Sequence, residues 1–82
     1  MLLKFSSDAR KQLKKLPKPE KIKVVKKIQV LKGNPYLGKK LKGEYENLRS
    51  FKTWPYRIIY NYSPQNQLLF IDAIEHRQGA YK

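Results

Sequence analysis

A small set of basic and aromatic side chains in the second half of the chain could do acid–base or phosphate chemistry. Arginine offers a planar, permanently charged fork for phosphate oxygens, and histidine ordinarily changes charge near neutral pH. Lysine can act as a base where neighbouring cations favour its neutral form, and tyrosine can supply a proton or stack on a nucleobase. The candidate catalytic residues are Lys52, Arg57, His76, Arg77 and Tyr81.

These residue types fit one reaction, in which an RNA 2′-hydroxyl attacks the adjacent phosphorus and expels the 5′-oxygen. That step needs a proton acceptor, cations for the crowded phosphorane and a proton donor. The chain has one histidine, which excludes a two-histidine scheme, and no cysteine. Its six acids are scattered without the spacing of a zinc or two-metal site. We therefore expect no metal and no cofactor.

Each candidate also has a purely structural interpretation. Arg57 can be a strand residue paired with Asp72 or Glu75, and His76 can be a hydrogen-bonded polar residue at a strand end. Tyr81 lies near the end of the chain, where little core is left to join, which favours a functional role.

The other aromatic residues of this region favour packing over chemistry. Tyr56, Tyr60 and Tyr62 alternate along one strand, so they share one face and are expected to be core or half-buried. Trp54 precedes Pro55 at a tight connection, where it is either a hydrophobic plug or an exposed stacking platform. We expect the plug.

The charge of the chain is strongly one-sided, with 19 Lys and Arg against 6 Asp and Glu and a net charge of +13. Such an excess favours a polyanionic or acidic partner, with nucleic acid first, an acidic protein second and an anionic membrane third. Positions 10 to 32 hold ten basic residues and one acid, which indicates a phosphate-binding surface more than a balanced, solvated helix face. The candidate RNA-binding residues are Arg10, Lys11, Lys14, Lys15, Lys26, Lys27, Lys39, Lys40 and Arg49.

Hydrophobic spacing predicts helices early and strands late. A short strand over residues 2–5 precedes a helix that carries Ala9, Leu13 and Leu16 and ends at Pro17. A second helix begins near Glu20 and stops at Gly33, and strands follow over 48–53, 56–62 and 67–75. The expected apolar stripe of the second helix is Ile22, Val25, Ile28 and Leu31, widened by Val24.

This order indicates the α+β class, with an N-terminal helical hairpin packed on a small antiparallel-rich β-sheet. A length of 82 residues predicts one domain over 1–82. No apolar run approaches the ~18 residues of a membrane span, so we expect a cytoplasmic protein without a membrane partner.

In these motifs the chain resembles the RelE/ParE superfamily, the toxin components of toxin–antitoxin pairs. The motifs are LKG at 41–43, LRSFK at 48–52, YRIIY at 56–60, and IEHR at 74–77 followed by Tyr81. The resemblance implies a RelE-like fold of two N-terminal helices packed on an antiparallel-rich sheet. For the RelE branch it implies metal-independent, ribosome-dependent cleavage of mRNA, silenced by a cognate acidic antitoxin that wraps the toxin.

Carried over by position, the resemblance implies that the basic and aromatic active-site set of the RelE branch corresponds to Lys52, Arg57, Arg77 and Tyr81, with His76 in the common HR pair. A further basic residue is frequent in this part of the strand among the relatives, and Arg49 provides that charge here. Strand alternation, however, places Arg49 on the face opposite Lys52. Trp54 and Pro55 stand where many relatives have a glycine-containing turn.

Three functions from different classes remain open on the sequence. The first is a translation-dependent endoribonuclease that acts on mRNA in the ribosome, and the pair Arg77 and Tyr81 favours it. The second is a gyrase inhibitor of the ParE branch, which binds a protein. The third is a non-catalytic nucleic-acid-binding module, suggested by the charge alone.

Overall fold

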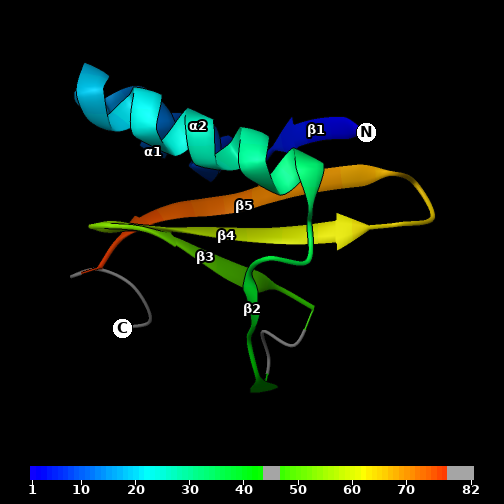
Figure 1. The fold of residues 1–82 in the computed structure, drawn as a ribbon. Coiled ribbons are helices and arrows are strands. Elements are labelled where there is room, and N and C mark those ends of the chain that lie inside the picture. The colour runs from blue at the N-terminus through cyan, green and yellow to red at the C-terminus, as the bar shows by residue number, and fades with distance from the viewer. Residues whose placement is uncertain (44–46, 78–82) are drawn as a thin grey trace.

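A computed structural model describes residues 1–43 and 47–77 of the chain. Two helices lie on one side of a single five-stranded sheet (Figure 1). In chain order the elements are β1 (Leu2–Phe5), α1 (Ser7–Lys15), α2 (Lys18–Gly33), β2 (Lys39–Lys40), β3 (Arg49–Thr53), β4 (Tyr56–Ser63) and β5 (Leu68–His76). The expected α+β class, with a helical pair packed on an antiparallel-rich sheet, is confirmed.

The sheet has the strand order β1-β5-β4-β3-β2. β1 runs parallel to β5, and the other three pairings are antiparallel. The strands expected over 48–53, 56–62 and 67–75 begin and end within one residue of β3, β4 and β5. The short edge strand β2 was not predicted, because two lysines in a turn-rich connector carry no strand periodicity.

Strand β5 contains a bulge that changes which side chains face the helices. Ile59 pairs with Ala73 and Tyr60 pairs with Ile71, so Asp72 is an extra residue on β5. Two side chains of the α1 region bind the β5 backbone here: Ser6 Oγ, at the N-cap, donates to the Asp72 carbonyl oxygen (2.6 Å), and Gln12 Oε1, further along the helix, accepts from the Ile74 amide (2.7 Å). Ser6 also caps α1 by accepting from the Ala9 amide, so one side chain ties the helix to the sheet.

Helix α2 starts earlier, and buries a different stripe, than its sequence pattern predicts. It begins at Lys18 because Pro19 lies in the first turn, where its missing amide hydrogen costs no helical hydrogen bond. Val24, Ile28 and Leu31 are buried, whereas Ile22 and Val25 are exposed, so that part of the expected stripe is wrong. The three residues that face the sheet are spaced four and three positions apart along the helix. The neighbouring apolar residues Ile22 and Val25 face the solvent.

The core lies between the helices and one face of the sheet. It joins residues of α1 and α2 to alternate residues of the two inner strands: Ala9, Val24, Ile28, Leu31, Ile58, Tyr60, Leu69, Ile71 and Ile74. As expected for the tyrosine row of β4, Tyr60 is buried and Tyr56 and Tyr62 are half-buried. Within the described residues, no helix has the length and apolarity needed to cross a membrane.

Candidate active site

Two of the predicted catalytic residues lie side by side on the face of the sheet opposite the helices. Lys52 of β3 pairs directly with Arg57 of β4, and Arg57 pairs directly with Glu75 of β5. Ile58 faces the helical core, so alternation along β4 turns Arg57 to the other face. Directly paired side chains start about 5 Å apart. We call Lys52, Arg57 and Glu75 the cross-strand row; it holds two cations and one carboxyl group.

The Glu75 carboxyl is electrostatically perturbed by its place in this row. Burial raises the pKa of Glu75, the nearby Asp72 carboxyl raises it further, and Arg57 opposes both effects. The Oε2 atom is buried and has no hydrogen-bond partner in the described part of the chain. Sequence reasoning treated Glu75 only as a possible partner of Arg57. The signal that could have identified it is its register opposite the YRIIY motif.

The raised pKa of Glu75 predicts a pH-dependent stability difference for Glu75→Gln. The folded state favours the protonated carboxyl. The wild type therefore loses stability as the pH rises from the ordinary pKa of a glutamate through the raised pKa of Glu75 in the folded protein. The amide never ionises, and Glu75→Gln should therefore gain stability relative to wild type between about pH 4 and about pH 7. Urea unfolding at both pH values measures this difference.

Asp8→Asn is the control for that comparison, because Asp8 is exposed in the first turn of α1, where the helix dipole favours negative charge. Its removal should not stabilise the protein at neutral pH. A stability difference for Glu75→Gln that stays constant across the pH range would contradict the assigned environment.

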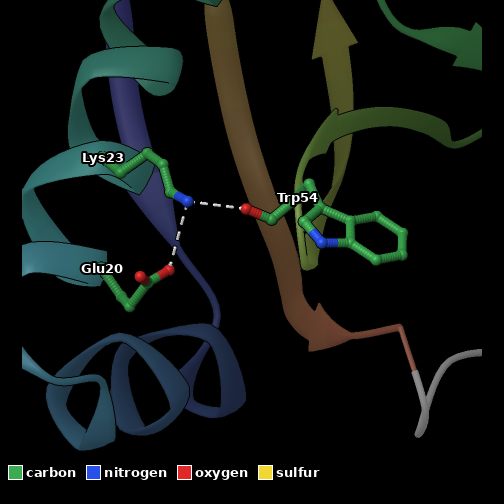
Figure 2. A network of polar contacts seen from close by, with 3 residues as sticks. All are labelled: Glu20, Lys23 and Trp54. Atoms are coloured by element: carbon green, nitrogen blue, oxygen red, sulfur yellow. Dashed lines mark hydrogen bonds and ion pairs between the residues drawn. The ribbon is translucent and has the colours of Figure 1, made fainter.

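Arg77 and Trp54 meet at the same end of the sheet. The Arg77 amide, directly after β5, donates to the Pro55 carbonyl oxygen (2.8 Å). The Arg77 guanidinium carbon lies 4.6 Å from the centroid of the Trp54 ring, within cation–π range. The Trp54 side chain is not the expected plug, since the residue is 64% exposed. Lys23 of α2 contacts its carbonyl oxygen (2.7 Å), and the ring points away from the helices (Figure 2).

His76 follows Glu75 at the end of β5, and alternation turns its side chain toward the helical side of the sheet. It pairs with Tyr56 in register, and the two rings meet edge to face with centroids 5.3 Å apart. Both rings line a hollow of about 360 Å³ with Lys15 of α1 and Glu75. The structure thus brings together Lys52 with Arg57, places Arg77 on Trp54, and puts His76 on the helical side. Tyr81 lies outside the described residues.

The predicted RNA-binding residues of α1 and α2 are mostly exposed. Arg10, Lys11 and Lys14 line a hollow of about 600 Å³ that also contains the apolar side chains of Phe5 and Leu13. On α2, Lys26 is exposed, and the Lys27 ammonium lies 5.7 Å from the centroid of the Phe51 ring. Lys15 is exposed beside the His76 hollow.

The remaining basic candidates lie at the other edge of the sheet. Lys39 and Lys40 form the exposed strand β2. Arg49 pairs with the core residue Tyr60, so it does lie on the face opposite Lys52, as alternation predicts. Its guanidinium donates to the Gly38 carbonyl oxygen (2.9 Å), which fastens the connector to β3.

The arrangement of two helices on a five-stranded mixed sheet is that of RelE-like toxins. The isolated Escherichia coli RelE toxin superposes with a TM-score of 0.80 at 22% identity, covering 92% of this chain and 82% of that one. The chain belongs to the ParE toxin family of type II toxin–antitoxin systems: the model of that family, described as the ParE toxin of parDE, matches residues 3–81. Membership in the RelE/ParE superfamily, predicted from the motifs, is confirmed.

Two further solved structures are similar over nearly the whole chain. The toxin–antitoxin complex RelBE2 of Mycobacterium tuberculosis contains a chain with 28% identity and a TM-score of 0.85, covering 93% of this chain and 96% of that one. A YoeB/ParE toxin of Agrobacterium tumefaciens has 20% identity and a TM-score of 0.82, with coverage of 93% and 98%. Among curated proteins, none matches the sequence at a significant level.

Proposed function

We propose that this toxin is a ribosome-dependent endoribonuclease that cleaves mRNA and so inhibits translation in the cytoplasm. The observation that carries the proposal is the cross-strand row, in which Lys52 and Arg57 are direct neighbours on the face opposite the helices. Two neighbouring cations there can bind the non-bridging oxygens of one phosphate, and their charge stabilises the additional negative charge of the phosphorane.

The reaction is an in-line transfer at phosphorus. The 2′-oxygen forms a bond to phosphorus as its proton passes to a base, and the bond from phosphorus to the 5′-oxygen breaks as that oxygen gains a proton. The products are a 2′,3′-cyclic phosphate and a 5′-hydroxyl. Lys52 and the Glu75 carboxyl are the groups of the cross-strand row that can exchange protons. Arg77 and Tyr81 complete the proposed site, with Tyr81 assigned from the family resemblance alone.

His76 has a separate place in the proposal, because it lies on the helical side beside Tyr56. Lys52 and Arg57, which would bind the substrate phosphate, lie on the opposite face of the sheet. We propose that His76 contacts the substrate at the C-terminal end of β5, where it is the last residue of the strand. Its contribution is therefore expected to be smaller than that of Arg57.

We also propose a cognate antitoxin, acidic in composition, as the partner that silences the toxin. RelBE2 and the intact Escherichia coli RelBE assembly are both toxin–antitoxin complexes. The surface of this chain is suited to such a partner, because Arg10, Lys11 and Lys14 surround an apolar hollow that contains Phe5 and Leu13. An amphipathic acidic segment would match both its charge and its apolar floor.

Cleavage mapping of an mRNA in programmed ribosomes tests the proposed activity directly. The purified toxin should cut at defined positions, and Arg77→Ala should abolish or strongly weaken the cuts. Cuts that persist unchanged in Arg77→Ala would show that the site is assigned to the wrong residues. A folded protein that leaves mRNA intact in the ribosome would refute the nuclease itself.

The basic residues of α1 predict that ribosome affinity falls steeply with salt, as in any phosphate-dominated complex. Lys11→Gln with Lys14→Gln should reduce the slope of log affinity against log salt concentration by about one to two. Lys4→Gln, on the edge strand β1, is the matched control and should change it less. Affinities measured from low to high salt give both slopes, and a response that hardly varies with salt would count against this surface.

The second candidate function is gyrase inhibition, and the match to the ParE toxin model favours it. A supercoiling assay with purified gyrase separates the two candidates. Blocked supercoiling in the absence of ribosome-dependent cutting would assign the protein to this second function.

A further inference from the structure

An exposed aromatic platform lies beside the cross-strand row. We infer that the Trp54 indole, with the Arg77 guanidinium against it, is a stacking site for an unpaired nucleobase of the RNA. This inference rests on the proposed function, since it names the part of an RNA substrate that the site would hold. It adds a binding site for a base to the cross-strand row, whose two cations are proposed to bind phosphate.

The exposure of the indole is the first argument. Trp54 is the chain's only tryptophan, and it is 64% exposed although burial of so large a ring would stabilise the fold. Proteins that bind single-stranded nucleic acid place bases on aromatic rings and on guanidinium planes. Trp54 and Arg77 provide one of each, 4.6 Å apart. The exposed indole surface remains open to a base.

The second argument is that the platform is held in place from α2 and from β5. Lys23 Nζ donates to the Trp54 carbonyl oxygen (2.7 Å) and lies 3.5 Å from Glu20 Oε2, which orients the lysine (Figure 2). On the other strand, the Arg77 amide donates to the Pro55 carbonyl oxygen (2.8 Å). These bonds hold the backbone that carries the indole, and the Arg77 guanidinium packs against the ring itself, so less conformational entropy is lost when a base stacks there. Lys23 is thus a positioning residue.

The third argument is the place of the platform relative to the cations. Thr53 pairs with Tyr56 next to the connection, and Lys52 pairs with Arg57 one position further along. Lys52 and Trp54 are two residues apart, about 7 Å along an extended chain. One nucleotide can bridge this separation, with its base on the indole and its phosphate on the cross-strand row.

The single tryptophan allows a direct test by intrinsic fluorescence. Short single-stranded RNA titrated into the purified toxin should quench the Trp54 emission, because a stacked base contacts the indole. An abasic oligonucleotide of the same length carries the same phosphates, and it should bind without this quenching. Fluorescence anisotropy of labelled oligonucleotides reports binding independently. RNA that binds by anisotropy without any quenching, or equal quenching by the abasic strand, would overturn the inference.

Variants test the same site without the intrinsic probe. Trp54→Leu should weaken RNA binding about tenfold or more while leaving the salt slope unchanged, because it removes a stacking surface and no charge. Trp54→Tyr keeps an aromatic face and should retain most of the affinity. Circular dichroism should show both variants folded, as expected for an exposed residue.

Tyr36→Leu is the matched control, because Tyr36 is also an exposed aromatic residue (56%) with an arginine against its ring. The Arg49 guanidinium carbon lies 5.2 Å from the Tyr36 ring centroid, in the β2 region and away from the cross-strand row. We expect its RNA affinity to match wild type. Equal losses in Tyr36→Leu and Trp54→Leu, or wild-type affinity in Trp54→Leu, would overturn the inference.

The outcomes separate this inference from the proposed nuclease function. Quenching by RNA in a protein that cuts no mRNA would support the stacking site and refute the nuclease. Cleavage of mRNA in ribosomes without quenching of the Trp54 emission by RNA would support the nuclease and refute the stacking site. Quenching by an acidic polyglutamate peptide but not by RNA would make Trp54 a protein contact and overturn the stacking site.

Discussion

Arg57→Ala should lower the rate of ribosome-dependent mRNA cleavage by about 10²- to 10³-fold, the usual cost of removing one preorganised donor to a developing oxyanion. Arg57 occupies the centre of the cross-strand row, between Lys52 and Glu75. Its guanidinium can reach two oxygens of one phosphate, and no neighbouring side chain of the row can replace that planar fork. Single-turnover cleavage on programmed ribosomes measures the loss.

Arg57→Lys is the matched variant, because it keeps the positive charge and removes the fork. It should recover part of the rate that Arg57→Ala loses, since lysine binds phosphate as a point charge. Circular dichroism and urea unfolding must show Arg57→Ala folded. If that variant cuts mRNA at the wild-type rate, or if it unfolds, Arg57 is a structural residue of β4 and the proposed site is wrong.

Gly38→Ala should destabilise the protein by about 2–4 kcal/mol, through overpacking and broken buried hydrogen bonds. A Cβ atom at Gly38 would lie 2.5 Å from the hydroxyl oxygen of Tyr60 and 2.6 Å from a ring carbon. Tyr60 is fully buried, so its ring has no free space into which to move. Its hydroxyl accepts from the Gly38 amide (2.8 Å) and donates to the Pro35 carbonyl oxygen (2.7 Å). A displaced ring would lose both bonds.

Thermal unfolding measures this effect, with about 4–8 °C of Tm expected per kcal/mol in a domain of this size. Gly33→Ala is the control, because a Cβ there meets no atom within 4 Å. It should stay within about 0.5 kcal/mol of wild type. Equal melting temperatures for the two variants would mean that the connector can shift away from Tyr60, contrary to the packing described.

The Tyr60 hydroxyl is suited to this role because burial raises the pKa of Tyr60, although the Gly38 amide and Arg49 oppose the shift. The phenol therefore keeps its proton as a donor to Pro35 under ordinary conditions. Arg49 binds the Gly38 carbonyl oxygen from the neighbouring strand, so the same short connector is held from both β3 and β4. This explains how a turn-rich segment is fixed against the sheet.

Local patterns were sufficient to predict most elements of the fold. Runs of β-branched and aromatic residues bounded by turn residues located β3, β4 and β5 to within one residue, and β5 was recognised although it is apolar on both faces. The first helix was predicted from the apolar spacing of Ala9, Leu13 and Leu16. The start of α2 was placed near Glu20, two residues too late, because proline at position 19 is tolerated in a first helical turn.

The errors in the candidate site have a common cause, which is that exposure depends on neighbours distant in sequence. Trp54 was expected to be buried because tryptophan usually is, but α2 contacts the Trp54 backbone through Lys23 and the ring remains exposed. Ile22 and Val25 were expected to face the sheet, and the packing of α2 buries Val24 instead. Neither outcome is encoded in the periodicity of one segment.

The amino-acid sequence was sufficient to identify the residue types of a phosphate-binding surface, the order of helices and strands, and the resemblance to a toxin family. Local polarity and spacing are properties of single segments, so they can be read from the sequence without knowledge of the fold. Which candidates lie close together depends on the packing of the strands, because the strand register and the bulge at Asp72 determine the face of the sheet on which each following residue lies. The register places Lys52, Arg57 and Glu75 in one row and His76 on the helical side of the sheet. Arg77, directly after β5, contacts the Trp54 ring.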